Sequence, residues 1–248
     1  MQRYFISTPY KKDEIRLSGE AFHHMIRVMR MKPEDEVYLV YADQIAIIAK
    51  IVAIEEDAVI LTEVEKERQN KELPLLVTIA SGYPKGDKLE WIVQKGTELG
   101  AYEFIGFPAQ SSVVKWDEKK LAKKKQRLVK IAQEAAEQSQ RQLTPNVELL
   151  ANEGQLWDKL DAYDAIVVAY EESAKQGEKA QLVQVLQSLP AGSRLLAIFG
   201  PEGGITPDEI EKLKAGGGKL CGLGPRILRT ETAPLYLLSA ISYQWELL

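Results

Sequence analysis

Apolar and polar residues alternate with a period of about two in the first part of the chain. The stretch 36–64, EVYLVYADQIAIIAKIVAIEEDAVILTEV, is rich in Val, Ile and Tyr and is broken by the polar runs ADQ and EED. It predicts three strands joined by tight turns, in a small antiparallel barrel or sheet. A short helix carrying AFHHMIRVMR is predicted to begin after Ser18. Lys66–Glu72, KERQNKE, holds no apolar residue and predicts a linker.

Beyond residue 72, strand-like apolar runs alternate with stretches of helical periodicity. LPLLVTIAS, YEFIGF, VELL, DAIVVAY, RLLAIFG and KLCGL are the strand candidates. A helix after GYPKG has the capping pattern of Asp87 and Glu90 and stops at Gly100, and a long helix spans 116–142. Such alternation indicates a parallel sheet covered on both faces, so the fold class is α/β. We therefore predict a β-rich domain at 1–70 and an α/β domain at 73–248.

The run LLAIFGPEGGITPDEIEKL predicts a strand, a glycine turn at 200–204 and a helix that begins with the capping box of Thr206 and Glu209. Ligands of parallel sheets bind outside the carboxyl ends of the strands. Neither GxxxxGK[ST] nor GxGxxG is present, and Glu202 disfavours a phosphate inside the loop. A neutral or cationic nucleoside fits better, and a purely structural turn is the alternative.

A second glycine turn, Gly222–Pro225, follows a predicted strand and precedes a helix that starts near Thr230. Two such turns at neighbouring strand ends would form one cleft. Arg226 and Arg229 are suited to anionic groups, and a surface salt bridge with Glu231 is the alternative.

Composition narrows the class of protein. The chain has 248 residues, is 45% hydrophobic and carries a net charge of −4, so total charge does not indicate a nucleic-acid binder. The single cysteine, Cys221, excludes an intrachain disulfide and a cysteine metal cluster. Adjacent His23 and His24 would point about 100° apart on a helix, which disfavours a shared metal. With no signal peptide and no long apolar run, we expect a cytoplasmic protein without membrane spans or metal.

Basic residues are concentrated in two segments. The first 33 residues hold seven Lys or Arg against three acids, and 115–130 holds eight against two. On a helix, the second group gathers on one broad side. This predicts a track for RNA phosphates, with a solvated helix face as the alternative. The candidates for RNA contact are Arg3, His23, His24, Arg27, Arg30, Lys119, Lys120, Lys123, Lys124 and Arg226.

GPEGG at 200–204 and LGPRILRTETA at 223–233 resemble the RsmE family of SPOUT RNA methyltransferases. HHMIRVMR, KGDKLEWIVQKGTELG and EAAEQSQRQLTP extend the resemblance along nearly the whole chain. The resemblance implies a PUA-like β-barrel domain followed by an α/β domain with a trefoil knot. It also implies a homodimer, S-adenosylmethionine as methyl donor, and methylation of N3 of a uridine in 16S ribosomal RNA of the small ribosomal subunit.

The residues that would hold the cofactor follow from the same resemblance. They are Phe199, Gly200, Pro201, Glu202, Gly203, Leu223, Gly224, Ile227, Leu228 and Thr230. Uracil N3 carries a proton, so methylation there needs a base or a cation that stabilises the forming anion. Arg229 is the candidate for the cation and Glu231 for the base. The alternatives are a noncatalytic RNA-binding ribosome factor, a ribose 2′-O-methyltransferase of the same superfamily, and a nucleotide-dependent metabolic enzyme.

Overall fold

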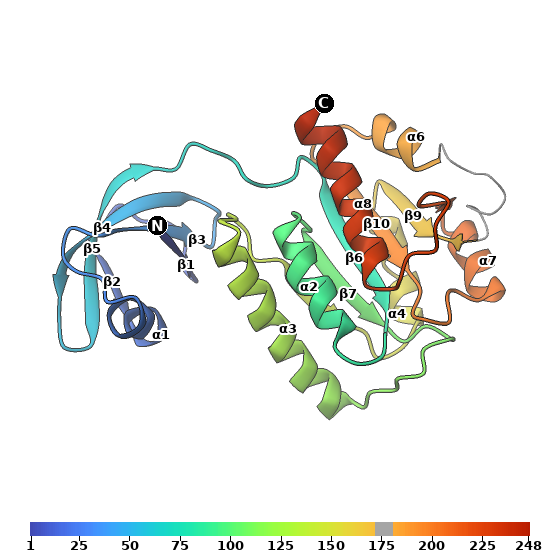
Figure 1. Ribbon diagram of the computed structural model, residues 1–248, viewed down its shortest axis with the longest axis horizontal. Coiled ribbons are helices and arrows are strands. Elements are labelled where there is room, and N and C mark those ends of the chain that lie inside the picture. Colours follow the sequence, from blue (N-terminus) through green and yellow to red (C-terminus); the bar gives the residue numbers. More distant parts are fainter. Residues whose placement is uncertain (172–180) are drawn as a thin grey trace. The chain divides into compact units, whose positions relative to one another are not determined.

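The chain divides into two units. The computed structural model describes residues 1–171 and 181–248. The first unit comprises Met1–Glu72 and Ala136–Leu143, and the second comprises Leu73–Ala135 and Thr144–Leu248 (Figure 1). The short segment of 136–143 groups with the first unit although it lies far along the chain, which the predicted contiguous domains do not anticipate.

A five-stranded sheet forms most of the first unit, in the order β1-β3-β4-β5-β2. Its strands are β1 (Gln2–Ile6), β2 (Ile15–Ser18), β3 (Glu36–Tyr41), β4 (Ala46–Ile54) and β5 (Ala58–Lys66). The three predicted strands are confirmed. The prediction missed β1 and β2, which are short and interrupted by basic residues, and β1 runs parallel to β3, so the sheet is mixed. Among the described residues, β1 and β2 are the two edges of this sheet.

The predicted helix after Ser18 is confirmed, but most of it is wound as a π-helix. α1 (Gly19–Phe22) continues directly into the π-helical η1 (His23–Val28). Met25, which is fully buried, faces the same core as Val37, Leu39 and Ile47 of the sheet. The helix therefore covers one apolar face of the sheet, and His23 and Arg27 stay exposed.

Arg3 is a structural residue in this fold, contrary to the prediction that it contacts RNA. Its side chain is fully buried, and Nη2 donates to Glu67 Oε1 at 2.8 Å. Nη1 donates to the carbonyl oxygen of Arg141 at 3.2 Å, and the guanidinium lies over the ring of Tyr38. A guanidinium enclosed in this way offers no charge to a phosphate, so this prediction is wrong.

The predicted linker is also held by ion pairs. Glu67 accepts from Lys71 Nζ at 2.6 Å as well as from Arg3, and Glu72 pairs with the Arg141 guanidinium. Burial alone would raise the pKa of Glu67, but the hydrogen bonds from Lys71 and Arg3 outweigh it and lower that pKa. A stretch without apolar residues is thus fixed by charge, which a search for hydrophobic periodicity does not detect.

Six parallel strands form the sheet of the second unit, in the order β11-β9-β10-β6-β7-β8. They are β6 (Leu76–Gly82), β7 (Glu103–Phe107), β8 (Asn146–Leu149), β9 (Ala165–Ala169), β10 (Arg194–Phe199) and β11 (Gly218–Cys221). The predicted α/β class with a parallel sheet is confirmed. Every predicted strand of this domain is present, with shifts of a few residues at its ends.

Helices cover both faces of this sheet. They are α2 (Lys88–Glu98), α3 (Glu118–Gln138), α4 (Gly154–Trp157), η2 (Leu160–Ala162), α6 (Gln181–Ser188), α7 (Pro207–Ala215), α8 (Thr232–Ser242) and η3 (Tyr243–Leu247). Figure 1 shows α2, α3 and α8 across one face. Alternate residues of β10 serve the two cores: Leu195 and Ala197 face the core that includes α2 and α8, and Leu196 and Ile198 face the core that includes α4 and α7. This alternation is the strand period of two.

Local signals at the helix ends account for two differences from prediction. α3 begins at Glu118 because Asp117 Oδ1 accepts from the backbone N–H of Lys120 at 2.8 Å, as an N-cap does. It ends at Gln138, ahead of Gln140, whose φ of 60° breaks the helix. The capping pattern predicted for Asp87 and Glu90 is wrong, since the Asp87 side chain makes no cap hydrogen bond.

Replacing Arg3 with Met should destabilise the first unit by about 3 kcal/mol, because it removes a buried bidentate partner of the Glu67 carboxylate and leaves Lys71 as its remaining recorded cation. Arg16→Met is the matched control: Arg16 pairs with Glu55 and Asp57 on the surface, and its loss should cost below about 1 kcal/mol. Amide hydrogen exchange of β3 and β4 measures both changes.

The deficit of the Arg3 variant should also depend on pH. Because the pKa of Glu67 is lower in the folded protein than in the unfolded chain, its stabilising contribution is complete above the unfolded pKa and is lost as the pH falls through the folded pKa. The difference between wild type and Arg3→Met should therefore shrink below the ordinary glutamate range. A constant difference down to acid pH would contradict this account of the pair.

Candidate functional site

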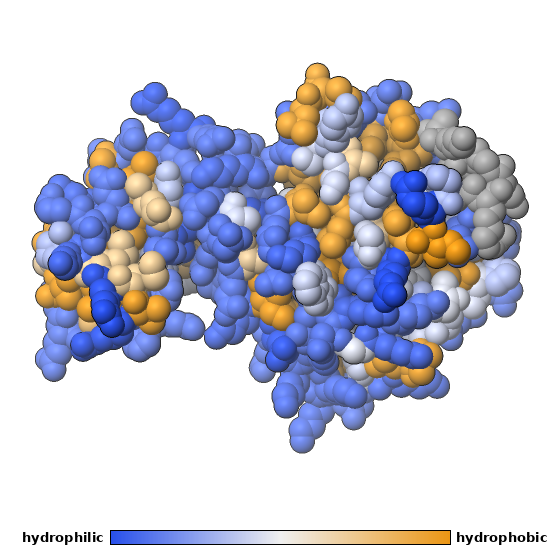
Figure 2. Space-filling model, viewed as in Figure 1, coloured by the Kyte–Doolittle hydropathy of each residue, from blue (hydrophilic) through white to orange (hydrophobic). Residues whose placement is uncertain are grey.

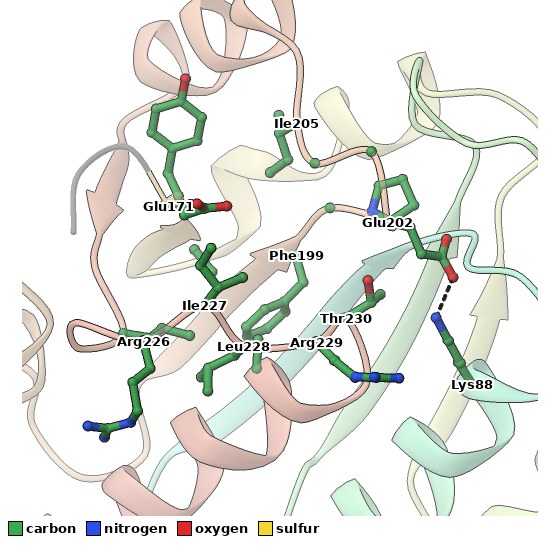
Figure 3. Close-up of a pocket in the computed structure, with 18 of the residues that line it drawn as sticks. Lys88, Glu171, Phe199, Glu202, Ile205, Arg226, Ile227, Leu228, Arg229 and Thr230 are labelled. Atoms are coloured by element: carbon green, nitrogen blue, oxygen red, sulfur yellow. Dashed lines mark hydrogen bonds and ion pairs between the residues drawn. The ribbon is translucent and has the colours of Figure 1, made fainter. Parts of the chain in front are cut away.

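A pocket of about 640 Å³ lies at the carboxyl ends of the central strands of the second unit (Figure 3). This volume is within the range of small-molecule sites, which span roughly 300 to 1,000 Å³. The two predicted glycine turns meet here, because β10 and β11 both flank β9 in the sheet. All ten residues predicted to hold a cofactor line this pocket: Phe199, Gly200, Pro201, Glu202, Gly203, Leu223, Gly224, Ile227, Leu228 and Thr230.

Two regions of the lining are absent from the predicted set. Ala169, Tyr170 and Glu171 follow from β9, the strand between the two glycine turns. Lys88 comes from the start of α2. The position of Glu171 after a buried strand was a signal in the sequence for the first region, whereas no local pattern singled out Lys88.

The turn after β10 requires glycine because its backbone folds closely on itself. A Cβ on Gly200 would lie 2.6 Å from the carbonyl carbon of Gly204, which is closer than any normal contact. Gly204 has a φ of +74°, in the region that side chains disfavour. The loop after β7 closes against the turn, where the Ser111 hydroxyl donates to the carbonyl oxygen of Gly204. Bare backbone therefore forms this wall of the pocket.

The capping box predicted at the start of α7 is confirmed, and its Glu209 also binds a neighbouring loop. The Glu209 carboxylate accepts from the backbone N–H of Thr206 at 2.8 Å, and Thr206 Oγ1 accepts from the N–H of Glu209. Glu209 is fully buried, and its other oxygen accepts from the backbone N–H of Gln110 at 2.9 Å. One side chain thus fixes both the start of α7 and the loop after β7 beside the glycine turn.

Glu202 is paired within the pocket. Lys88 Nζ donates to Glu202 Oε1 at 2.7 Å, and the backbone N–H of Lys85 donates to the same oxygen at 3.1 Å. Burial alone would raise the pKa of Glu202, but these hydrogen bonds outweigh it and lower that pKa, while the bond to Glu202 raises the pKa of Lys88. Since the carboxylate is compensated by an ammonium, Glu202 repels an anionic ligand less than its charge in the sequence indicates.

The two arginines of the second turn point in different directions. In Figure 3 the Arg229 side chain extends toward Lys88 and Glu202, and the Arg226 side chain extends away from them. Both line the pocket. Glu231 stands at the N-cap position of α8, and its Oε2 lies 3.7 Å from Lys88 Nζ. The partner recorded for Glu231 is therefore Lys88, and the anticipated arginine salt bridge is not seen in the described part of the chain.

The basic candidates of the first unit differ in exposure. His23, Arg27 and Arg30 are exposed. His24 is half-buried, with Nδ1 at 2.9 Å from Tyr4 Oη, so it packs against the sheet. Burial, reinforced by the charge of Glu137, raises the pKa of Tyr4 to about 12. The hydroxyl therefore stays protonated and can donate to the ring of His24.

Glu90 of α2 forms ion pairs with part of the basic face of α3. Lys119, Lys120 and Lys123 are exposed. Arg127 Nη2 lies 2.7 Å and Lys124 Nζ 3.4 Å from the Glu90 carboxylate. Burial alone would raise the pKa of Glu90, but these two partners lower it. Lys124 thus contributes less to a cationic track than its three exposed neighbours.

The described part of the chain has neither a metal-binding cluster nor a membrane-spanning helix. The described residues contain no group of three or more His, Cys, Asp or Glu placed to hold a metal ion. Over 1–171 and 181–248, no helix combines the length and apolar character needed to cross a bilayer. Cys221, the last residue of β11, is buried in the core.

Comparisons with known proteins agree with this architecture. The family model for an RNA methyltransferase domain matches residues 71–242, and that for an RNA methyltransferase PUA domain matches 17–64. The chain is 52% identical to ribosomal RNA small subunit methyltransferase E of Bacillus subtilis (strain 168), over 100% of this chain and 98% of that protein.

Two solved structures resemble the whole chain. The Neisseria gonorrhoeae ribosomal RNA small subunit methyltransferase E bound to S-adenosyl methionine is 25% identical, with a TM-score of 0.83 over 99% of this chain and 98% of that one. A Legionella pneumophila methyltransferase in complex with the same cofactor is 26% identical, with a TM-score of 0.80 over 98% and 97%. The chain therefore belongs to the RNA methyltransferase family that includes ribosomal RNA small subunit methyltransferase E.

Proposed function

We propose that this protein transfers a methyl group from S-adenosylmethionine to N3 of a uridine in 16S ribosomal RNA of the small subunit. The observation that carries the proposal is the pocket formed by two glycine turns in a chain of this family. Two relatives of similar fold are described as bound to S-adenosyl methionine. The Bacillus subtilis relative is named for small-subunit ribosomal RNA.

The residues of the pocket suit this cofactor. Phe199, Leu223 and Leu228 supply apolar surface for a purine, and the backbone of both glycine turns leaves N–H and C=O groups for polar recognition. Glu171 and Glu202 supply carboxylates that can attract a cation or an ammonium group. When bound, the cofactor supplies a methyl group on a positively charged sulfur. These walls would hold it still, and much of the catalysis of an in-line displacement is positioning.

Arg229 and Glu231 take the proposed chemical roles. A guanidinium remains protonated at any working pH, so Arg229 would stabilise the negative charge that develops on uracil as N3 loses its proton. Glu231 is the candidate base, and its Oε2 is buried without a hydrogen-bond donor among the described residues. Arg226, whose side chain points away from Lys88, is the candidate for contact with a phosphate of the RNA.

The RNA would be bound by exposed side chains of each unit, considered separately. Arg27 and Arg30 offer cations in the first unit, with the exposed ring of His23 beside them in sequence, and Lys119, Lys120 and Lys123 offer cations in the second. Phosphate contacts give affinity without sequence readout. We place the reaction in the cytoplasm, where this RNA is assembled.

A homodimer is part of the proposal. Apolar and aromatic side chains remain exposed along α8 and η3, and Figure 2 shows hydrophobic residues gathered there. Tyr236 is 42% exposed, Tyr243 57% and Leu247 73%. A second copy covering this helix would remove them from water. The trefoil knot of the C-terminal domain stays a prediction from the family.

We do not propose the alternative functions. A noncatalytic ribosome factor would need the basic surfaces but no pocket built from conformationally demanding glycines. A nucleotide-dependent metabolic enzyme would give no function to the exposed lysines of α3. The third alternative is a ribose 2′-O-methyltransferase. Methylation found at a ribose 2′-oxygen would replace our proposal of N3.

Gly200→Ala should weaken binding of S-adenosylmethionine at least about tenfold, because the added Cβ would force the turn away from Gly204. Isothermal calorimetry measures the affinity. Gly154→Ala is the control, since its Cβ would meet only the side-chain oxygen of Asn152, outside the pocket. Equal affinities for wild type and Gly200→Ala would contradict the assignment of this turn to the cofactor.

Arg229→Ala should lower kcat by roughly 10² to 10³, as the loss of one group that stabilises a developing charge does. Arg229→Lys keeps a charge without the guanidinium fork and should recover part of the rate. Single-turnover methyl transfer to small-subunit RNA measures the effect, with cofactor affinity determined alongside. Arg194→Ala, at the amino end of β10, serves as control. Full turnover by both Arg229 variants would remove the residue from the chemistry.

Replacing Lys119, Lys120 and Lys123 with Gln should weaken RNA binding for all sequences alike. Each phosphate contact contributes roughly 0.7 to 0.9 to the slope of log affinity against log salt, so the slope should flatten by about 2. Lys124 is omitted because it pairs with Glu90. The triple replacement of exposed Lys212, Lys214 and Lys219 matches the charge change elsewhere. An unchanged slope would make the α3 face a solvated surface only.

A further inference from the structure

Lys88 stands where three segments of the second unit meet. It is the first residue of α2, and its Nζ lies 2.7 Å from Oε1 of Glu202 in the turn after β10. The same nitrogen lies 3.7 Å from Oε2 of Glu231 at the start of α8. Lys88 is 114 residues from Glu202 along the chain, so the fold alone brings them together.

The Lys88 ammonium lies between two carboxylates, those of Glu202 and Glu231, and can bridge them. An ammonium has three donors, and Glu202 takes one of them. Among the described residues, Glu231 Oε2 is buried and accepts no hydrogen bond, and the Lys88 ammonium lies 3.7 Å away as its recorded ion-pair partner. The three side chains are each about one-third exposed or less, and water screens them only in part.

A second feature ties the same turn to the segment before α2. The backbone N–H of Lys85 donates to Glu202 Oε1 at 3.1 Å, which places the amino end of α2 against the turn by two independent contacts. Glu231 follows Arg229 by two residues, and Figure 3 shows Arg229 extending toward the pair of Lys88 and Glu202. Lys88 therefore lies against two segments that contribute to the pocket lining: the turn after β10 and the segment that ends at Glu231.

We infer that Lys88 is a positioning residue of the methyl-transfer site, whose ammonium holds the turn of Glu202 and the segment of Glu231 together. Holding Glu231 fixes the backbone two residues away and thereby the direction of Arg229. This inference rests on the proposed function for its catalytic meaning. Its structural half, the coupling of two segments through one cation, is independent of any ligand.

A surface ion pair without consequence is the opposing account, and many such pairs contribute little. The two accounts predict different effects of losing Lys88 on the segment 226–231. A simple pair with Glu202 would affect residues 200–204 alone, whereas a bridge affects 226–231 as well. Amide hydrogen exchange resolves the two segments separately in the full chain without cofactor.

The test compares Lys88→Met and Lys88→Arg with wild type. We expect Lys88→Met to speed amide exchange about tenfold in both segments, and Lys88→Arg, which keeps a cation with several donors, to stay near wild type. Lys95→Met is the matched control, because it removes a charge from the same helix where Lys95 pairs with Glu98. Its exchange in both segments should equal that of wild type.

The same variants are then assayed for affinity and rate. Lys88→Met should raise the Kd of S-adenosylmethionine in calorimetry and lower kcat by roughly 10 to 100, since small displacements of catalytic groups have effects of this size. Lys88→Arg should recover most of both. A change confined to Kd, with kcat intact, would overturn the positioning of Arg229.

Three outcomes separate the inference from the proposed function. Unchanged exchange in Lys88→Met, or a change in 200–204 alone, overturns the bridge. Faster exchange in both segments with arginine rescue, together with the loss of rate, supports it. If wild type neither binds the cofactor nor methylates RNA, the proposed function fails and Lys88 has no reaction to position, while the exchange pattern still decides whether it couples the segments.

Discussion

The carboxyl ends of neighbouring parallel strands must lie at the same edge of a sheet, and the pocket depends on this constraint. β9, β10 and β11 are adjacent although β11 begins about twenty residues after β10 ends, so the segments that follow them converge. A turn at such an edge can expose its backbone only where side chains are absent. Gly200 meets that requirement because a Cβ there would lie 2.6 Å from the carbonyl carbon of Gly204, and Gly204 meets it through its φ of +74°. The chemistry proposed for the site begins from this arrangement of bare backbone.

Charge compensation is the second requirement of the site. Lys88 lies 2.7 Å from Glu202 and 3.7 Å from Glu231, so one ammonium compensates two carboxylates at the proposed site. Partial burial makes the balance matter, because isolated charges are costly away from water. The same principle acts in the first unit, where Arg3 and Glu67 are buried as a pair. In both units, charges far apart in sequence become partners only in the fold.

Patterns in the sequence predicted those features of the structure that depend on residues close together in the chain. The β10 strand, the glycine turn and the capping box of Thr206 and Glu209 lie within fifteen residues or so, and each follows from residue types at fixed spacing. The ten predicted pocket residues were instead taken from the family resemblance, and their two segments meet because β10 and β11 both flank β9. The partners of Arg3 and Lys88 were beyond such reasoning, since they lie 64 and 114 residues away. The strands β1 and β2 were missed because edge strands of four or five residues hold too few apolar positions to show a period.

The position of the transferred methyl group tests the central claim most directly. Small-subunit ribosomal RNA lacking the modification is incubated with the protein and isotopically labelled S-adenosylmethionine, digested to nucleosides and separated by mass spectrometry. The account predicts one labelled nucleoside, N3-methyluridine, formed only with active protein. Label on a ribose 2′-oxygen, on another base or on no nucleoside would contradict it.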